Sequence, residues 1–156
     1  MNFTIDRIDY EILAKLQNDA RLSNKELAAA VGLAPSTCLG RVQRLRNDGI
    51  LGGAHAEVNP EAFGIGIQAL IAVQLQKHSR SSVKSFWKHV MAQPEVLAVY
   101  HVTGEHDFQV QVAVRDANHL RDLAMDAFTT RPEVSRIGTS LIFQAERKPV
   151  MPNYRT

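Results

Sequence analysis

The stretch that decides the fold of the first half is residues 23–49, which read SNKELAAAVGLAPSTCLGRVQRLRNDG. Ser23 and Glu26 form an S-x-x-E capping box, which predicts a short helix over residues 24–31. Gly32 follows in the position that ends many helices. Pro35 then opens a further helix, because a missing N–H costs little at the first helical position. The stretch therefore predicts two helices joined by a tight turn that contains glycine.

The second of these helices, expected over residues 35–47, has an apolar stripe and a polar outer face. Cys38, Val42 and Leu45 recur at helical spacing and predict the buried side. Two such helices around a glycine-containing turn are typical of a helix-turn-helix. The outer face carries hydrogen-bonding and cationic side chains, namely Ser36, Thr37, Gly40, Arg41, Gln43, Arg44 and Asn47.

The segments on either side extend this pattern into a domain. Residues 6–19 predict a first helix with Asp6 as its N-cap. Residues 50–58 predict two short strands around a Gly-Gly turn, which would form a wing. We therefore expect a winged helix-turn-helix domain over residues 1–60 and a linker over residues 61–66.

The second half predicts an α+β domain over residues 67–148, followed by a tail at 149–156. Apolar and polar residues alternate from Ile67 onward, as in a strand with one buried face. The Gly104 turn joins two further strands as a hairpin. The order β-α-β-β-α-β is that of a ferredoxin-like fold. The expected strands cover 67–76, 96–103, 107–114 and 134–143, and the expected helices cover 82–92, with Phe86 and Trp87 inward, and 118–130.

Two helices cover only one face of a four-stranded sheet, so the other face needs a different cover. The sequence assigns Leu70, Ala72, Leu97, Val99 and Ala113 to that second face. Pairing of two such faces in a homodimer is the simplest way to bury them.

Composition narrows the class of protein. The net charge of +2 and the pI of about 8.9 give only a weak indication of an anionic partner. No apolar run reaches the length of a membrane span. One cysteine, Cys38, allows no intrachain disulfide. The six histidines lack metal-ligand spacing. We therefore expect a cytoplasmic protein with no membrane partner, no cofactor and no metal.

Ordered motifs along the whole chain resemble the Lrp/AsnC family of regulators. The first half of the chain carries Ile5-Asp6-x-x-Asp9, Glu26-Leu27-Ala28, Val31-Gly32-Leu33 and Arg41-Val42-x-x-Leu45-x-x-x-Gly49-Ile50; the second half carries Asn59-Pro60-x-x-Phe63-Gly64 and Val102-Thr103-Gly104-x-x-Asp107-Phe108. The resemblance implies a transcriptional regulator that binds double-stranded DNA. It also implies a dimer that often assembles into an octamer, and a small-molecule effector such as an amino acid.

The helix-turn-helix context makes the outer face of the helix at 35–47 the expected DNA contact. Residues near the start of a recognition helix face base edges, and later cations usually meet phosphates. Arg41 has the alternative of a bidentate contact to guanine. A solvated helix face, with Arg44 bridging to Asp48, is the competing interpretation. The expected DNA contacts are Ser36, Thr37, Gly40, Arg41 and Arg44.

The resemblance places the effector at the turn between the two hairpin strands. Backbone N–H groups around a glycine turn can hold a carboxylate, and an aspartate can meet an ammonium group. The competing interpretation is ordinary turn chemistry, with Gly104 and Asp107 shaping the hairpin. The expected effector contacts are Thr103, Gly104, His106 and Asp107, with Thr139 and Ser140 carried over by approximate position.

Two other functions compete with the regulator. Haem-biosynthesis decarboxylases resemble the same two-domain architecture, and a tetrapyrrole carboxylate would need His101, His106 and Arg115 around a pocket. The polar face around Ser36 and Thr37 argues against an enzyme, so we expect no catalytic residues. A sensing module that acts through protein contacts is the third possibility.

Overall fold

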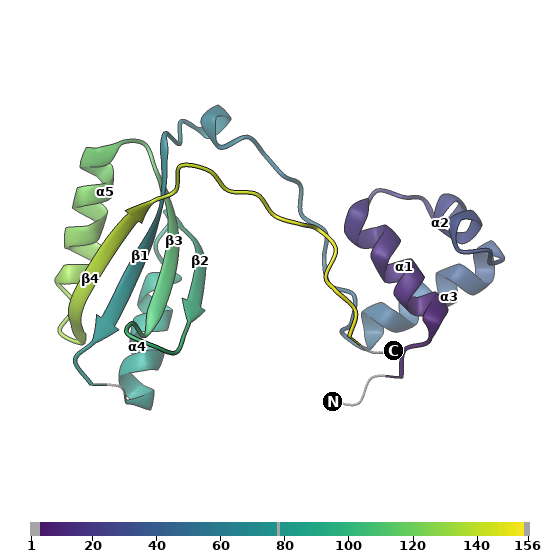
Figure 1. The fold of residues 1–156 in the computed structure, drawn as a ribbon, viewed down its shortest axis with the longest axis horizontal. Helices are drawn as coiled ribbons and strands as arrows, with labels where there is room; N and C mark the ends of the chain where they lie inside the picture. The colour runs from purple at the N-terminus through teal and green to yellow at the C-terminus, as the bar shows by residue number, and fades with distance from the viewer. Residues whose placement is uncertain (1–3, 78, 155–156) are drawn as a thin grey trace. The chain divides into compact units, whose positions relative to one another are not determined.

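The computed structural model describes residues 4–77 and 79–154, and the chain divides into two compact units. A helical unit takes the chain up to Glu57 together with the segment from Glu146 onward, and an α/β unit takes Val58–Ala145. Figure 1 labels the helices and strands of both units.

Three helices form the helical unit: α1 at Arg7–Asn18, α2 at Asn24–Ala30 and α3 at Pro35–Asn47. The predicted capping box of α2 is confirmed, because Ser23 and Glu26 each accept from the other's backbone N–H. Asp6 caps α1, as expected. α3 starts without a side-chain cap at Ala34, and Pro35 occupies its first turn. Its position must therefore come from contacts with the other two helices.

The helices meet on one apolar core. The stripe of α3 predicted from helical spacing is buried, and residues of α1, α2 and the loops complete the cluster. The buried members are Ile12, Leu27, Ala28, Val31, Cys38, Val42 and Leu45.

The predicted wing was wrong, because residues 52–59 form no strand. Ile50 and Leu51 instead fold back on the helical core, and their backbone N–H groups both donate to the carbonyl of Leu45, at 2.9 and 3.0 Å. The four residues that follow are Gly, Gly, Ala and His, which have little preference for a strand. The helix-turn-helix is therefore wingless in this structure.

The α/β unit has the predicted βαββαβ order and an antiparallel sheet in the order β2-β3-β1-β4. Within this unit, a short 3-10 helix, η1 at Pro60–Phe63, precedes the first strand, and a π-helical turn, η2, continues the second α-helix. The elements are β1 at Ile67–Leu75, α4 at Arg80–Val90, β2 at Val96–His101, β3 at Phe108–Val114, α5 at Ala117–Leu123, η2 at Ala124–Thr129 and β4 at Val134–Leu141.

Both helices pack on one face of the sheet (Figure 1), where an aromatic cluster fills the centre. The ring centroids of Phe86 and Phe108 lie 4.8 Å apart, and those of Phe86 and Phe128 lie 6.2 Å apart. Trp87 was expected inward with Phe86, but 40% of it is exposed. Adjacent helix positions differ by about 100°, so Trp87 reaches only the rim of the core.

The second face of the sheet carries small and amide side chains. Leu70 and Ala72 of β1 are partly buried there, as predicted, and Gln111 donates to Gln68 across it at 3.2 Å. Val99 was assigned to this face wrongly, because it pairs with Val110 and packs on the helix-covered core. An irregularity between Val96 and Ala98 shifts the alternation of β2.

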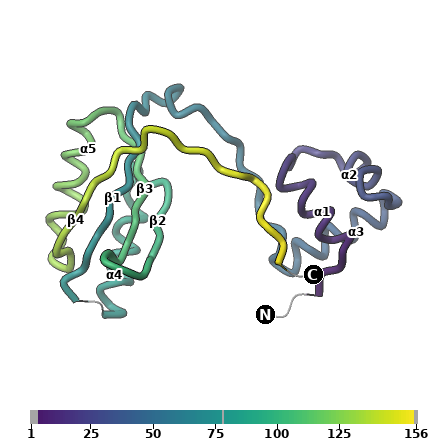
Figure 2. The backbone as a smooth tube through the Cα atoms, viewed as in Figure 1, coloured from purple at the N-terminus to yellow at the C-terminus, as the bar shows by residue number. Residues whose placement is uncertain are grey.

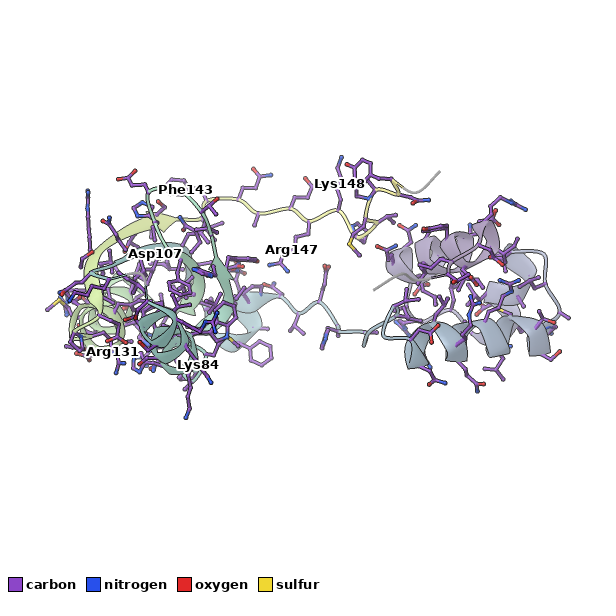
Figure 3. All side chains as sticks on the ribbon, turned by 90° about the horizontal axis from the view of Figure 1, so that it is seen from below. Lys84, Asp107, Arg131, Phe143, Arg147 and Lys148 are labelled. Carbon is purple, nitrogen blue, oxygen red and sulfur yellow. The ribbon has the colours of Figure 1, made fainter. Side chains whose placement is uncertain are left out.

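The segment after β4 returns to the helical unit, as the yellow end of the tube in Figure 2 shows. There the backbone N–H of Met151 donates to Oε1 of Gln17 on α1 at 3.0 Å. Phe143, labelled in Figure 3, precedes this segment and is 95% exposed. Among the described residues, no helix is both long and apolar enough to cross a membrane.

Candidate DNA-binding face and effector turn

The outer face of α3 is exposed along its length. Ser36, Thr37 and Gly40 of the predicted DNA contacts are all open to solvent. Since successive residues turn by about 100°, the line directly opposite the buried stripe consists of Ser36, Gly40, Gln43 and Asn47. That line is polar and carries no formal charge.

Arg41 and Arg44 lie to one side of this line and bind carboxylates of α1. Nη1 of Arg41 donates to Asp6 at 2.6 Å and to Asp9 at 2.9 Å, and Nη2 of Arg44 donates to Asp9. Arg44 therefore pairs with α1 and not with Asp48, its alternative partner from helical spacing. Of the five predicted DNA contacts, these two have protein partners in this structure.

Hydrogen bonds in this cluster shift the pKa values of Asp6 and Arg41. Hydrogen bonding from Arg41, helped by the backbone N–H of Asp9, holds the pKa of the Asp6 carboxyl below its ordinary value. The same contacts to Asp6 and Asp9 raise the pKa of Arg41. Asp6 and Arg41 therefore form an ion pair at neutral pH.

Asp9 is the residue that sequence reasoning missed. It is completely buried, and no other charged or polar side chain among the described residues is buried. A signal was present, because Asp9 lies three and four positions before Ile12 and Leu13, on the apolar stripe of α1. An acid at a core position indicates a cation from elsewhere in the chain as its partner.

The predicted effector turn is a tight hairpin between β2 and β3. Gly104 has a φ of +119°, which a side chain would disfavour. The N–H of Val102 donates to the carbonyl of Asp107 at 3.0 Å, and the N–H of Asp107 donates to Val73 at 2.9 Å. Asp107 also accepts from the N–H of Leu75 at 2.7 Å. Asp107, labelled within the α/β unit in Figure 3, therefore ties the turn to β1.

Two histidines flank this turn in different surroundings. The ring of His101 stacks on Phe108, with centroids 4.9 Å apart. His106 is partly buried, and its Nδ1 is buried without a hydrogen-bond partner within residues 4–77 and 79–154. Thr103 and Gly104 beside it are exposed. The turn thus offers one unsatisfied buried nitrogen next to open backbone.

Thr139 and Ser140 do not join this turn within one chain. Thr139 pairs with Ile71 and Ser140 with Leu70, so their side chains lie on opposite faces of the sheet. β1 separates them from β3, a distance of about 10 Å across two strand spacings. Within one chain, these two residues and the turn therefore do not form one site.

The residues needed for the enzyme alternative are likewise apart. His106 precedes β3 and Arg115 follows it, so nine residue steps, about 30 Å of extended chain, separate them. Within the described residues, no group of three or more His, Cys, Asp or Glu side chains is arranged to hold a metal ion.

Comparison with family models gives a match for each half of the chain. Residues 5–46 match the AsnC-type helix-turn-helix domain, and residues 68–150 match the Lrp/AsnC ligand binding domain.

Individual relatives match over most of the chain. The HTH-type transcriptional regulator AldR of Mycolicibacterium smegmatis is 42% identical over 140 residues, covering 90% of this chain and 82% of that protein. The DNA-binding transcriptional activator DecR of Escherichia coli is 34% identical, covering 90% and 92%. A crystal structure of a Neisseria meningitidis transcriptional regulator in complex with L-Met is similar at a TM-score of 0.85 and 32% identity, covering 93% and 94%.

Proposed function

Because this chain belongs to the Lrp/AsnC family of transcriptional regulators, we propose that it binds specific duplex DNA through α3 and that a small-molecule effector modulates this binding. The observation that carries the DNA part is the exposed polar line of α3, presented by a helix whose other sides are held by the unit's own core. A helix placed in this way fits the major groove.

We propose the β2–β3 turn as the effector site. A buried unpartnered nitrogen is rare in folded proteins, so Nδ1 of His106 favours a ligand at this turn. Open backbone at Thr103 and Gly104 suits a carboxylate. The similar Neisseria protein was crystallised with L-Met, which supports an amino acid as the effector class.

We propose a homodimer that pairs the second faces of two sheets. That face combines partly buried apolar and small side chains with amides already paired to each other, such as Gln68 and Gln111. Exposure of such a surface to water is unfavourable, and a second copy of the same face can bury it in a two-fold symmetric dimer. An octamer would then form through contacts outside this face. In such an assembly, Thr139 of one molecule would contact the β2–β3 turn of another.

Fluorescence anisotropy tests the function directly. Labelled duplexes are taken from the region upstream of the protein's own gene and from a random library selected with the protein. A scrambled duplex of equal length is the control, at fixed salt, with and without single amino acids. We expect a selected duplex to bind at least tenfold more tightly than the scrambled one, and one amino acid to shift that affinity.

Other results separate the alternatives. Equal binding of all duplexes at every salt concentration contradicts sequence-specific binding. Specific binding that no amino acid changes retains the regulator and contradicts the effector class. A tetrapyrrole that binds with a visible absorbance change would favour the enzyme instead.

A further inference from the structure

A single buried carboxylate holds two arginines of the recognition helix. Asp9 has no exposed surface, and it accepts from both Arg41 and Arg44. Asp6, at the start of the same helix, accepts from Arg41 as well. The side chain of Arg41 is 28% exposed and that of Arg44 is 44% exposed. α1 and α3 are thus joined by three charged contacts that centre on Asp9.

Releasing these arginines to a DNA phosphate would leave the buried Asp9 carboxylate with the backbone N–H of Asp6 as its remaining partner. A buried carboxylate without a cation beside it is unfavourable, so removing the half-exposed arginines costs more than breaking an ion pair whose two partners both lie in water. An exposed phosphate contact in water does not compensate for that loss. We therefore expect the two arginines to stay on Asp9 when α3 meets DNA.

The start of α3 lacks the anchoring that a capped helix would have. Ala34 provides no side-chain cap, and the apolar stripe fixes only the buried side. The contacts to Asp9 lie about 60–120° from that stripe, so they fix the rotation of α3 about its own axis. That rotation decides which side chains reach the floor of the groove.

We propose that Asp9 is a positioning residue for DNA recognition, which locks Arg41 and Arg44 onto α1 so that the uncharged line of Ser36, Gly40 and Gln43 reads the DNA. The two arginines then hold α3 against α1 and do not contact the DNA. This inference rests on the proposed sequence-specific binding, but its salt measurements use scrambled DNA and need no operator.

The test compares Asp9→Asn, Arg41→Gln and Arg44→Gln with the wild type. For each protein, the dissociation constant is measured on a selected duplex and on a scrambled duplex over a range of salt concentrations. Each phosphate contact contributes about 0.9 to the slope of log K against log salt. Arg46→Gln is the matched control, because it removes an exposed charge from the same helix without touching Asp9.

Asp9→Asn frees Arg44, leaves Arg41 only its contact with Asp6, and loosens α3. We expect scrambled DNA to bind more tightly with a slope steeper by up to about two units, while the ratio of selected to scrambled affinity falls at least tenfold. Arg41→Gln and Arg44→Gln should leave the slope on scrambled DNA within about 0.3 of the wild type, since neither side chain meets phosphate.

Three outcomes would overturn the proposal. Loss of about 0.9 in slope for Arg41→Gln or Arg44→Gln would show that the arginine contacts phosphate. If Asp9→Asn binds both duplexes more tightly by the same factor, Asp9 only competes with DNA for the arginines and does not position α3. A folded Asp9→Asn protein that binds as the wild type does would make the cluster purely structural.

Folding is checked by circular dichroism before each titration. If Asp9→Asn does not fold, Arg44→Gln still decides the question, because Asp9 keeps its contact with Arg41. The double variant Asp9→Asn/Arg41→Gln removes one charge of each sign, with a near-isosteric change at Asp9 and a shorter polar side chain at Arg41. Its slope should exceed the wild-type slope by about one unit, from Arg44 alone, and a slope at or below the wild-type value would contradict the proposal.

Discussion

The carboxylate of Asp107 accepts the backbone N–H of Leu75 at 2.7 Å, and this contact fastens the β2–β3 turn to the end of β1. Asp107→Ala leaves that N–H without its acceptor, so we expect a loss of about 1–3 kcal/mol in the free energy of unfolding. Asp107→Asn keeps an acceptor oxygen and should lose clearly less. Urea unfolding followed by Trp87 fluorescence measures both, because Trp87 is the chain's one tryptophan and lies in the α/β unit.

The same pair of variants separates structure from effector binding. If Asp107 also meets the ammonium group of an effector, Asp107→Asn weakens effector binding far more than it lowers stability. Equal losses of stability in the Ala and Asn variants would contradict the acceptor role. They would indicate that the negative charge of Asp107 is what stabilises the turn.

Gly66, just before β1, lies against the carbonyl of Arg115, just after β3. A Cβ on Gly66 would lie 2.5 Å from that oxygen. Because both residues directly flank paired strands and the N–H of Gly66 donates to the carbonyl of Val114 at 3.1 Å, neither backbone can move easily. Gly66→Ala should therefore destabilise the α/β unit by about 1–3 kcal/mol. Trp87 fluorescence in urea measures this change.

Gly138→Ala is the matched control, since no atom lies within 4 Å of its added Cβ. It should change the free energy of unfolding by less than about 0.5 kcal/mol, at a protein concentration that gives both variants the same assembly state. An unaffected Gly66→Ala protein would show that the strand ends can separate.

The sequence predicted the elements whose signals are local. The Ser23–Glu26 capping box, the Pro35 helix start and the alternation of β1 each depend on residues close in the chain, and all three are in the structure. The predicted wing is absent, because it required strands on both sides of Gly52 and Gly53. The residues beside these glycines have little preference for a strand.

The candidate sites were less predictable, because their partners are distant in sequence. Arg41 and Asp9 are 32 residues apart, and helical spacing within α3 suggested only Asp48 as a partner for Arg44. Val99 was misplaced for a related reason, since an irregularity in β2 changes the face without any signal in composition. Side-chain alternation predicts faces only while the register is unbroken.

Cys38 is fully buried in the helical core, and burial raises the pKa of its thiol. Both effects suppress the reactive thiolate, so native protein should react with a thiol reagent at neutral pH at least a hundredfold more slowly than unfolded protein. Because the chain has one cysteine, the labelling rate in increasing urea reports opening of the helical unit alone. Rapid labelling without urea would contradict the packing of α3 described here.

The contact between Asp6 and Arg41 predicts how acid affects the helical unit. The pKa of Asp6 is lowered in the folded protein, chiefly by the hydrogen bond from Arg41. A lowered folded pKa means that the stabilising contribution is present above the unfolded value of about 3.9 and is lost as pH falls through the folded pKa. Asp6→Asn removes this charge and keeps a good N-cap for α1.

We therefore expect the wild type to unfold at a higher urea concentration than Asp6→Asn at pH 6. The difference should shrink as the pH falls below about 3.9 and vanish once the pH is below the lowered pKa of folded Asp6. Amide cross-peaks of α1 and α3 in two-dimensional NMR follow the helical unit through each titration. Asp19→Asn, which removes an exposed carboxylate away from Arg41, should show no comparable difference at pH 6. A difference for Asp6→Asn that stays constant down to pH 3 would mean that the cap, and not the ion pair, is what Asp6 contributes.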